Sequence, residues 1–124
     1  MPLTLDGRRT GTFPAFVDEV NRVLAAMPDA PEAPWNGTLD ALADLLGNTS
    51  GPVVWQHAEA ARAALGHARM AEWLDTRVDF VHPTNRADIL DRLALARRGE
   101  GPTLFDALAN LMAASAPGGL RLDP

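Results

Sequence analysis

The sequence predicts an α/β domain in which a small three-stranded parallel sheet is packed with helices. Three short apolar segments, at residues 3–5, 53–55 and 120–122, have the length of strands, and most of the chain between them shows the three- and four-residue apolar spacing of helices. Strands separated by helices favour parallel pairing with right-handed crossovers. With 124 residues and 47% hydrophobic composition, we expect a single domain over residues 1–124.

The first half of the chain is predicted to alternate between regular elements and Pro- or Gly-containing loops. Thr12 and Thr38 are suitable N-caps, and Gly47 stands where helices commonly end. The apolar run at 53–55 lacks alternation, which indicates a strand buried on both faces. The expected elements are a strand at 3–5, a helix at 13–27, a loop at 28–34, a helix at 39–46, a loop at 48–52 and a strand at 53–55.

The second half is predicted to be mostly helical. Thr84 or Asn85 can cap one helix, Thr103 with Asp106 resembles a capping box, and residues 78–81 are ambiguous. Trp55 and Trp73 are expected in the core, whereas Trp35 is either a lid over the core or a contact for a partner. The expected elements are helices at 58–65, 67–77, 84–98 and 103–116 and a strand at 120–122.

Composition excludes several classes of function. The chain has no cysteine, so disulfides, thiolate nucleophiles and thiolate metal sites are excluded. Its net charge of −5 argues against general nucleic-acid binding, which needs a basic surface. We see neither a secretion signal nor a run of about 18 apolar residues. We therefore expect a cytoplasmic protein that neither spans a membrane nor binds nucleic acid.

Catalytic and metal-binding motifs are also missing from the sequence. His57, His67 and His82 are spaced too widely for a helical metal pair, and neither Ser50 nor Ser115 lies in a Gly-x-Ser-x-Gly motif. No glycine-rich loop leads into a helix, as a phosphate site would require. We expect no catalytic residue, no metal site, no cofactor and no enzymatic activity.

The acidity is concentrated in one stretch of the chain. Residues 10–61 contain seven acidic side chains and one arginine, a net charge of −6. In the helix predicted at 39–46, Leu39, Leu42 and Leu46 share one face at about 100° per residue. A second face, which we call the acidic stripe, consists of Asp40, Ala43, Asp44 and Gly47.

Two interpretations of the acidic stripe are open. Two like charges four residues apart cost about 0.2–0.5 kcal/mol, and no arginine lies between Arg22 and Arg62 to offset them. The stripe can be a solvated face whose repulsion is screened by salt. Alternatively, it accepts a basic partner, and its small residues permit close approach.

At this segment the sequence resembles the barstar family of ribonuclease inhibitors. The resemblance covers about residues 3–66. It rests on Trp-Asn-Gly-Thr-Leu-Asp-Ala-Leu at 35–42 with Asp44 following, on Gly-Pro-Val-Val-Trp at 51–55 and on Leu-Thr-Leu-Asp-Gly at 3–7. Order, spacing and flanking elements all agree, so the match is more specific than a lone short motif.

The resemblance implies a fold and a function. Members have a small three-stranded parallel sheet packed with helices. They block the basic active site of a secreted ribonuclease with the acidic second helix and the loop before it. By position, Asp44 would occupy the phosphate site of the nuclease. The implied partner-binding residues are Trp35, Asn36, Gly37, Asp40, Ala43, Asp44, Gly47 and Asn48.

The sequence departs from the family in three places. Ala43 stands where the best-known member of the family has an aromatic contact residue. Residues 67–102 look like a helical insertion before the last helix, and that helix has only Asp106 near its start, so the family's second acidic contact region is missing. We expect a monomer whose partner is a basic secreted ribonuclease. A barstar-like immunity or interaction domain that binds another basic protein is the alternative. An acid–base enzyme using Asp40 and Asp44 is a third hypothesis, which requires a deep pocket at these residues.

Overall fold

The computed structural model describes residues 2–28, 30–49 and 51–124. Asp29 and Ser50, which fall in the two loops expected from the sequence, lie outside this part of the chain. The described elements are β1 (Leu3–Asp6), the short 3-10 helix η1 (Gly7–Arg9), α1 (Phe13–Ala25), α2 (Leu39–Gly47), β2 (Val53–Gln56), α3 (Ala58–Ala64), α4 (His67–Arg77), α5 (Pro83–Arg97), α6 (Leu104–Ser115) and β3 (Leu120–Leu122).

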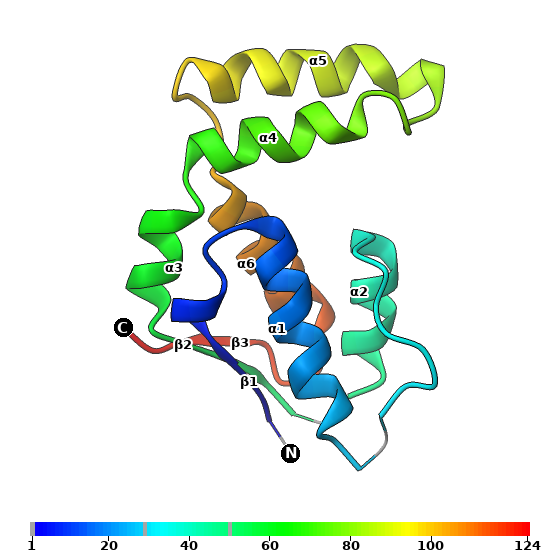
Figure 1. Ribbon diagram of the computed structural model, residues 1–124, viewed down its shortest axis with the longest axis vertical. Helices are drawn as coiled ribbons and strands as arrows, with labels where there is room; N and C mark the ends of the chain where they lie inside the picture. Colours follow the sequence, from blue (N-terminus) through cyan, green and yellow to red (C-terminus); the bar gives the residue numbers. More distant parts are fainter. Residues whose placement is uncertain (1, 29, 50) are drawn as a thin grey trace.

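The three strands form one parallel sheet in the order β1-β2-β3, as the sequence predicts. Val53 in the central strand pairs with Leu3 on one side and with Leu120 on the other. Figure 1 shows the sheet at the bottom of the molecule, with α1, α2 and α6 above it. Two crossovers of the same hand that step in the same direction place their helices on the same face of a sheet.

The prediction that β2 is buried on both faces is wrong. Val53 and Trp55 are buried, whereas Val54 is half-buried and Gln56 is exposed. The strand therefore alternates, because helices cover only the face to which Val53 and Trp55 point. On the other face Val54 lies beside its register partners Thr4 and Arg121.

The core lies between the covered face of the sheet and the helices. Trp55 is fully buried and stacks on Phe105 of α6, with ring centroids 4.7 Å apart. Its indole N–H donates to the hydroxyl of the buried Thr10 at 3.3 Å, so the polar end of the side chain is paired. Phe16 of α1 packs against the same indole at 5.6 Å. These contacts join α1, β2 and α6 in one apolar cluster.

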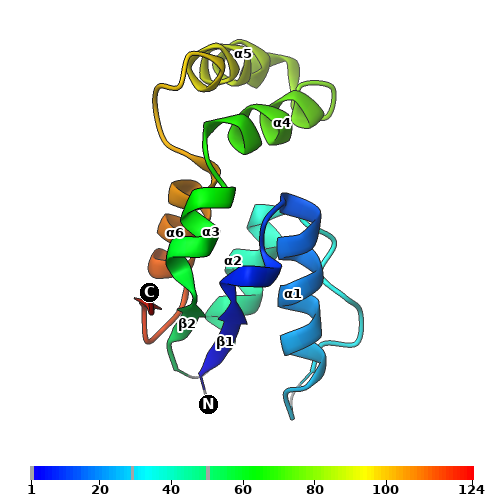
Figure 2. The same ribbon diagram turned by 60° about the vertical axis from the view of Figure 1, so that its left-hand side comes forward.

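Helices α4 and α5 form a hairpin that packs against itself at the end of the molecule away from the sheet (Figures 1 and 2). The hairpin reaches the rest of the protein mainly through α6. The backbone N–H of Phe105 donates to the carbonyl of Leu65 at 2.9 Å. The residues that precede and follow the hairpin segment therefore lie next to each other.

Helix ends agree with the sequence in some places and differ in others. The capping box of Thr103 and Asp106 at the start of α6 is present as predicted. α5 begins earlier than expected, because His82 is its N-cap and accepts the N–H of Thr84 at 3.2 Å, while Pro83 occupies the first helical turn. Neither Thr84 nor Asn85 is the cap. Among the described residues, no helix has both the length and the apolar character needed to cross a bilayer.

Candidate functional site

Helix α2 presents the acidic stripe on the protein surface. Its opposite face is anchored, because Leu42 and Leu46 are fully buried and α2 packs mainly against α6. The side chains of Asp40 and Asp44 are exposed. Ala43 is half-buried and Gly47 is exposed at the end of the helix, where the exposed Asn48 is the C-cap. The helix is therefore fixed by its apolar face and open on its acidic face.

The two aspartates of the stripe form no ion pair within the described part of the chain. Within residues 2–28, 30–49 and 51–124, no arginine or histidine lies within ion-pair distance of Asp40 or Asp44. Arg22, the one arginine in this stretch of sequence, binds the buried Glu19 instead, with its Nε 2.7 Å from Oε1. The negative charge of the stripe is therefore not neutralised within the described part of the chain.

Trp35 fixes the loop that leads into α2. Its side chain is 4% exposed, which decides between the two interpretations of this residue in favour of a lid over the core. The indole N–H donates to the carbonyl of Thr38 at 2.7 Å. The amide of Asn21 holds the backbone of Trp35 on both sides: Oδ1 accepts its N–H at 2.7 Å and Nδ2 donates to its carbonyl at 3.1 Å. The Trp35 ring itself is not available for a partner.

The residues between Trp35 and α2 form an exposed turn. The Oδ1 atom of Asn36 accepts both the N–H and the hydroxyl of Thr38, at 3.1 and 2.9 Å. Thr38 is the N-cap residue of α2, but its side chain makes no capping hydrogen bond to the helix, contrary to expectation. Gly37 has a φ of +91°, a left-handed conformation that favours glycine. These contacts give the turn a defined shape next to the acidic stripe.

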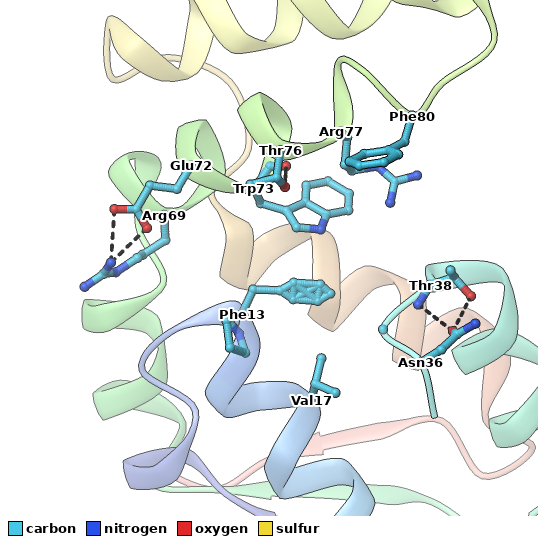
Figure 3. Close-up of a pocket in the computed structure, with 12 residues that line it drawn as sticks. Phe13, Val17, Asn36, Thr38, Arg69, Glu72, Trp73, Thr76, Arg77 and Phe80 are labelled. Carbon is cyan, nitrogen blue, oxygen red and sulfur yellow. Dashed lines mark hydrogen bonds and ion pairs between the residues drawn. The ribbon is translucent and has the colours of Figure 1, made fainter. Parts of the chain in front are cut away.

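A cleft of about 730 Å³ opens beside this turn (Figure 3). One wall is the start of α1, with Phe13 and Val17, and the other is the face of α4 that carries Trp73 and Arg77. The turn at residues 36–38 closes one end. The rings of Phe13 and Trp73 meet edge to face at the back, with centroids 5.8 Å apart. We call this feature the aromatic cleft.

The sequence did not reveal the aromatic cleft. Trp73 was expected in the core from its helical spacing, but it is only partly buried and lines the cleft. Arg77 lies over its ring, with the guanidinium carbon 4.8 Å from the ring centroid. Phe80, in the turn after α4, is 88% exposed at the mouth. In the sequence, the available signal is the short spacing between Trp73, Arg77 and Phe80. Only the fold brings these residues to the turn before α2.

A second group of charges lies where β1 ends, and it is internally compensated. Arg8 donates to Asp6 at 3.1 Å and holds the pKa of that carboxyl at about 2. Burial alone would raise the pKa of Glu19, but hydrogen bonds from Arg22 and from the Asp6 N–H outweigh it, so this pKa lies below its ordinary value. Both carboxylates are therefore held ionised by partners within the protein. This cluster stabilises the fold and leaves little charge free for a ligand.

Metal sites and relatives add no further assignment. The described residues include no group of three or more histidine, aspartate or glutamate side chains that could hold a metal ion. The ring nitrogens of His67 and His82 instead bond to the Gly101 carbonyl and to Thr84. Searches against models of protein families, curated proteins and solved structures gave no match. No known protein therefore assigns a role to the acidic stripe or to the aromatic cleft.

Proposed function

We propose that this protein is a barstar-like inhibitor that blocks the basic active site of a secreted ribonuclease. The observation that carries the proposal is the exposed pair Asp40 and Asp44, which has no cationic partner in the described chain and sits on a helix anchored by its other face. A carboxylate held in place can occupy a phosphate site on the nuclease, where arginine or lysine side chains are already positioned. Inhibition is then occlusion of the site, with no chemistry by this chain.

Rigidity of the turn before α2 supports this function. The hydrogen bonds that Trp35 makes with Asn21 and Thr38 fix the backbone before the helix, so less conformational freedom is lost when a partner binds. The net charge of −6 over residues 10–61 would attract a basic partner and raise the association rate. This rate should fall as salt is added, because the Debye length shortens from about 30 Å at 0.01 M to about 8 Å at 0.15 M.

The open position of the two aspartates favours binding over acid–base catalysis. Catalytic carboxylates work in a pocket that gives them different environments. Asp40 and Asp44 are both exposed, and neither lines the aromatic cleft. A shallow acidic face suits contact with a protein surface.

The test is inhibition of the ribonuclease that the same strain secretes or encodes beside this chain. We expect stoichiometric inhibition, with Asp44→Ala weakening binding by about 30-fold or more, the loss typical of a central interface residue. Asp91→Ala is the matched control, because Asp91 is an exposed carboxylate on α5 with no ion pair among the described residues. Equal losses for the two variants would mean that the site is misplaced.

Two further outcomes would contradict the proposal. A flat association rate between low and high salt, measured by stopped flow, would reject steering by the acidic surface. If the purified protein leaves the nuclease fully active but captures a different basic protein from the culture medium, the ribonuclease function is wrong. The protein would then be a barstar-like domain that binds the captured protein instead of a ribonuclease.

A further inference from the structure

The aromatic cleft combines aromatic walls with one cation, Arg77, that forms no ion pair among the described residues. Arg69, on the same helix, is paired with Glu72 at 2.8 Å. Arg77 stacks on Trp73 instead, and within the described ranges no carboxylate lies within ion-pair distance of it. A guanidinium that lies over an aromatic ring still has N–H donors for a planar acceptor. The chemistry of the cleft is therefore apolar with one free basic group.

The exposed aromatic surface indicates that the cleft is used for binding. Phe80 is 88% exposed and Trp73 is only partly buried, although aromatic side chains gain most when they leave water. Together with Phe13 they line a concave apolar surface whose rim is polar. Surfaces of this kind are typical of binding sites in proteins.

The position of the cleft connects it to the acidic stripe. Residues 36–38 close one end of the cleft and continue directly into α2. Asp40 follows Thr38 by two residues, which is about 3 Å along a helix axis, and Asp44 is about 6 Å further on. A standard protein interface covers about 800 Å² on each partner. The cleft is therefore within reach of a protein that docks on the acidic stripe through such an interface.

We propose that the aromatic cleft receives a large apolar side chain, with a carboxylate beside it, from the same basic partner that docks on the acidic stripe. The inference rests on the proposed function, because it takes that partner as given. The apolar group would lie against the contacting rings of Phe13 and Trp73, beside Phe80, and the carboxylate would bind N–H donors of Arg77. The face would then present negative charge at α2 and positive charge at the cleft, which fixes the orientation of the partner and excludes proteins that are merely basic.

The first test uses a small probe and does not need the partner. N-acetyl-L-phenylalanine carries an aromatic ring and a carboxylate, and its amide is the uncharged control. We expect saturable NMR shifts at the Trp73 indole N–H and the Arg77 Nε–H, with a Kd on the order of 1 mM. The acid should bind at least about threefold more tightly than the amide. Absence of saturable shifts, or equal binding of acid and amide, would overturn the inference.

A matched pair of variants isolates the arginine. Arg77→Gln should remove the preference for the acid. Arg62→Gln should preserve it, because Arg62 also lies 4.8 Å from the centroid of an aromatic ring, that of Phe105, but is paired with Glu59 and lies on α3, away from the cleft. Loss of the preference in both variants would show that the effect is general and would overturn the assignment to Arg77.

The second test uses the secreted ribonuclease. Phe80→Ser changes a side chain that is almost fully exposed, so it should leave the melting temperature unchanged while weakening inhibition by about tenfold, as Arg77→Gln should. If Asp44→Ala weakens inhibition but Phe80→Ser and Arg77→Gln do not, the proposed function stands and the cleft inference is wrong. If Asp44→Ala has no effect, the proposed function itself fails. A dimer in solution that Phe80→Ser dissociates would assign the cleft to a second copy of this chain and overturn the inference.

Discussion

Asn21→Ala tests whether one half-buried amide holds the turn before α2. The change removes both hydrogen bonds to the backbone of Trp35, at 2.7 and 3.1 Å. A neutral hydrogen bond contributes about 0.5–1.5 kcal/mol, so the pair is worth about 1–3 kcal/mol. Because Trp35 is 4% exposed, water cannot easily replace the lost partners, and the upper half of this range is expected.

The control is Asn110→Ala, an exposed asparagine in α6 for which the structure shows no side-chain hydrogen bond within the described chain. Both variants gain the same helix propensity, roughly 0.6 kcal/mol, so the difference between them isolates the hydrogen bonds. Urea unfolding followed by circular dichroism gives the free energies, and hydrogen exchange of the Trp35 amide reports the local effect. A difference below about 0.5 kcal/mol, or an equally protected Trp35 amide, would refute the reasoning.

Three further predictions have defined outcomes. The free energy of unfolding should fall as pH decreases below about 4.5, because the folded-state pKa of Glu19 lies below its ordinary value. In Glu19→Gln, the measured free energy of unfolding should depend less on pH in this range. Gly7→Ala should lower the free energy of unfolding in urea by about 1–3 kcal/mol, since the added Cβ would overlap the His57 carbonyl. In Gly47→Ala the added Cβ meets no atom within 4 Å, so this variant should stabilise α2 by about 0.5–1 kcal/mol. Asp44→Asn should leave thermal stability unchanged or raise it by about 0.2–0.5 kcal/mol; a loss above 1 kcal/mol would show that the stripe is structural.

The sequence predicts the elements well because their signals are local. The apolar spacing of α1 and the capping box of α6 each depend on residues within a few positions of one another. The exposure of Asp40 and Asp44 follows from the same local geometry, since the face with Leu42 and Leu46 has to be buried. The parallel sheet follows from the alternation of strands and helices.

The remaining features depend on contacts between distant residues. The side of the sheet that the helices occupy decides whether Val54 is covered. The local sequence of the strand does not specify that side. Trp35 is a lid because Asn21, fourteen residues earlier, holds its backbone. The aromatic cleft needs α4 to lie opposite the start of α1, which joins Phe13 and Trp73 across sixty positions. No local pattern specifies such a distance.

The hydrogen bond between Leu65 and Phe105 has a consequence for how such proteins can diversify. The segment between these two residues begins and ends at neighbouring positions, so its length can change without altering the register of the strands. One wall of the cleft, including Trp73 and Arg77, belongs to this segment, whereas α2 belongs to the scaffold formed by the rest of the chain. Under the proposed function, exchanging the hairpin would therefore give the same scaffold a different target preference.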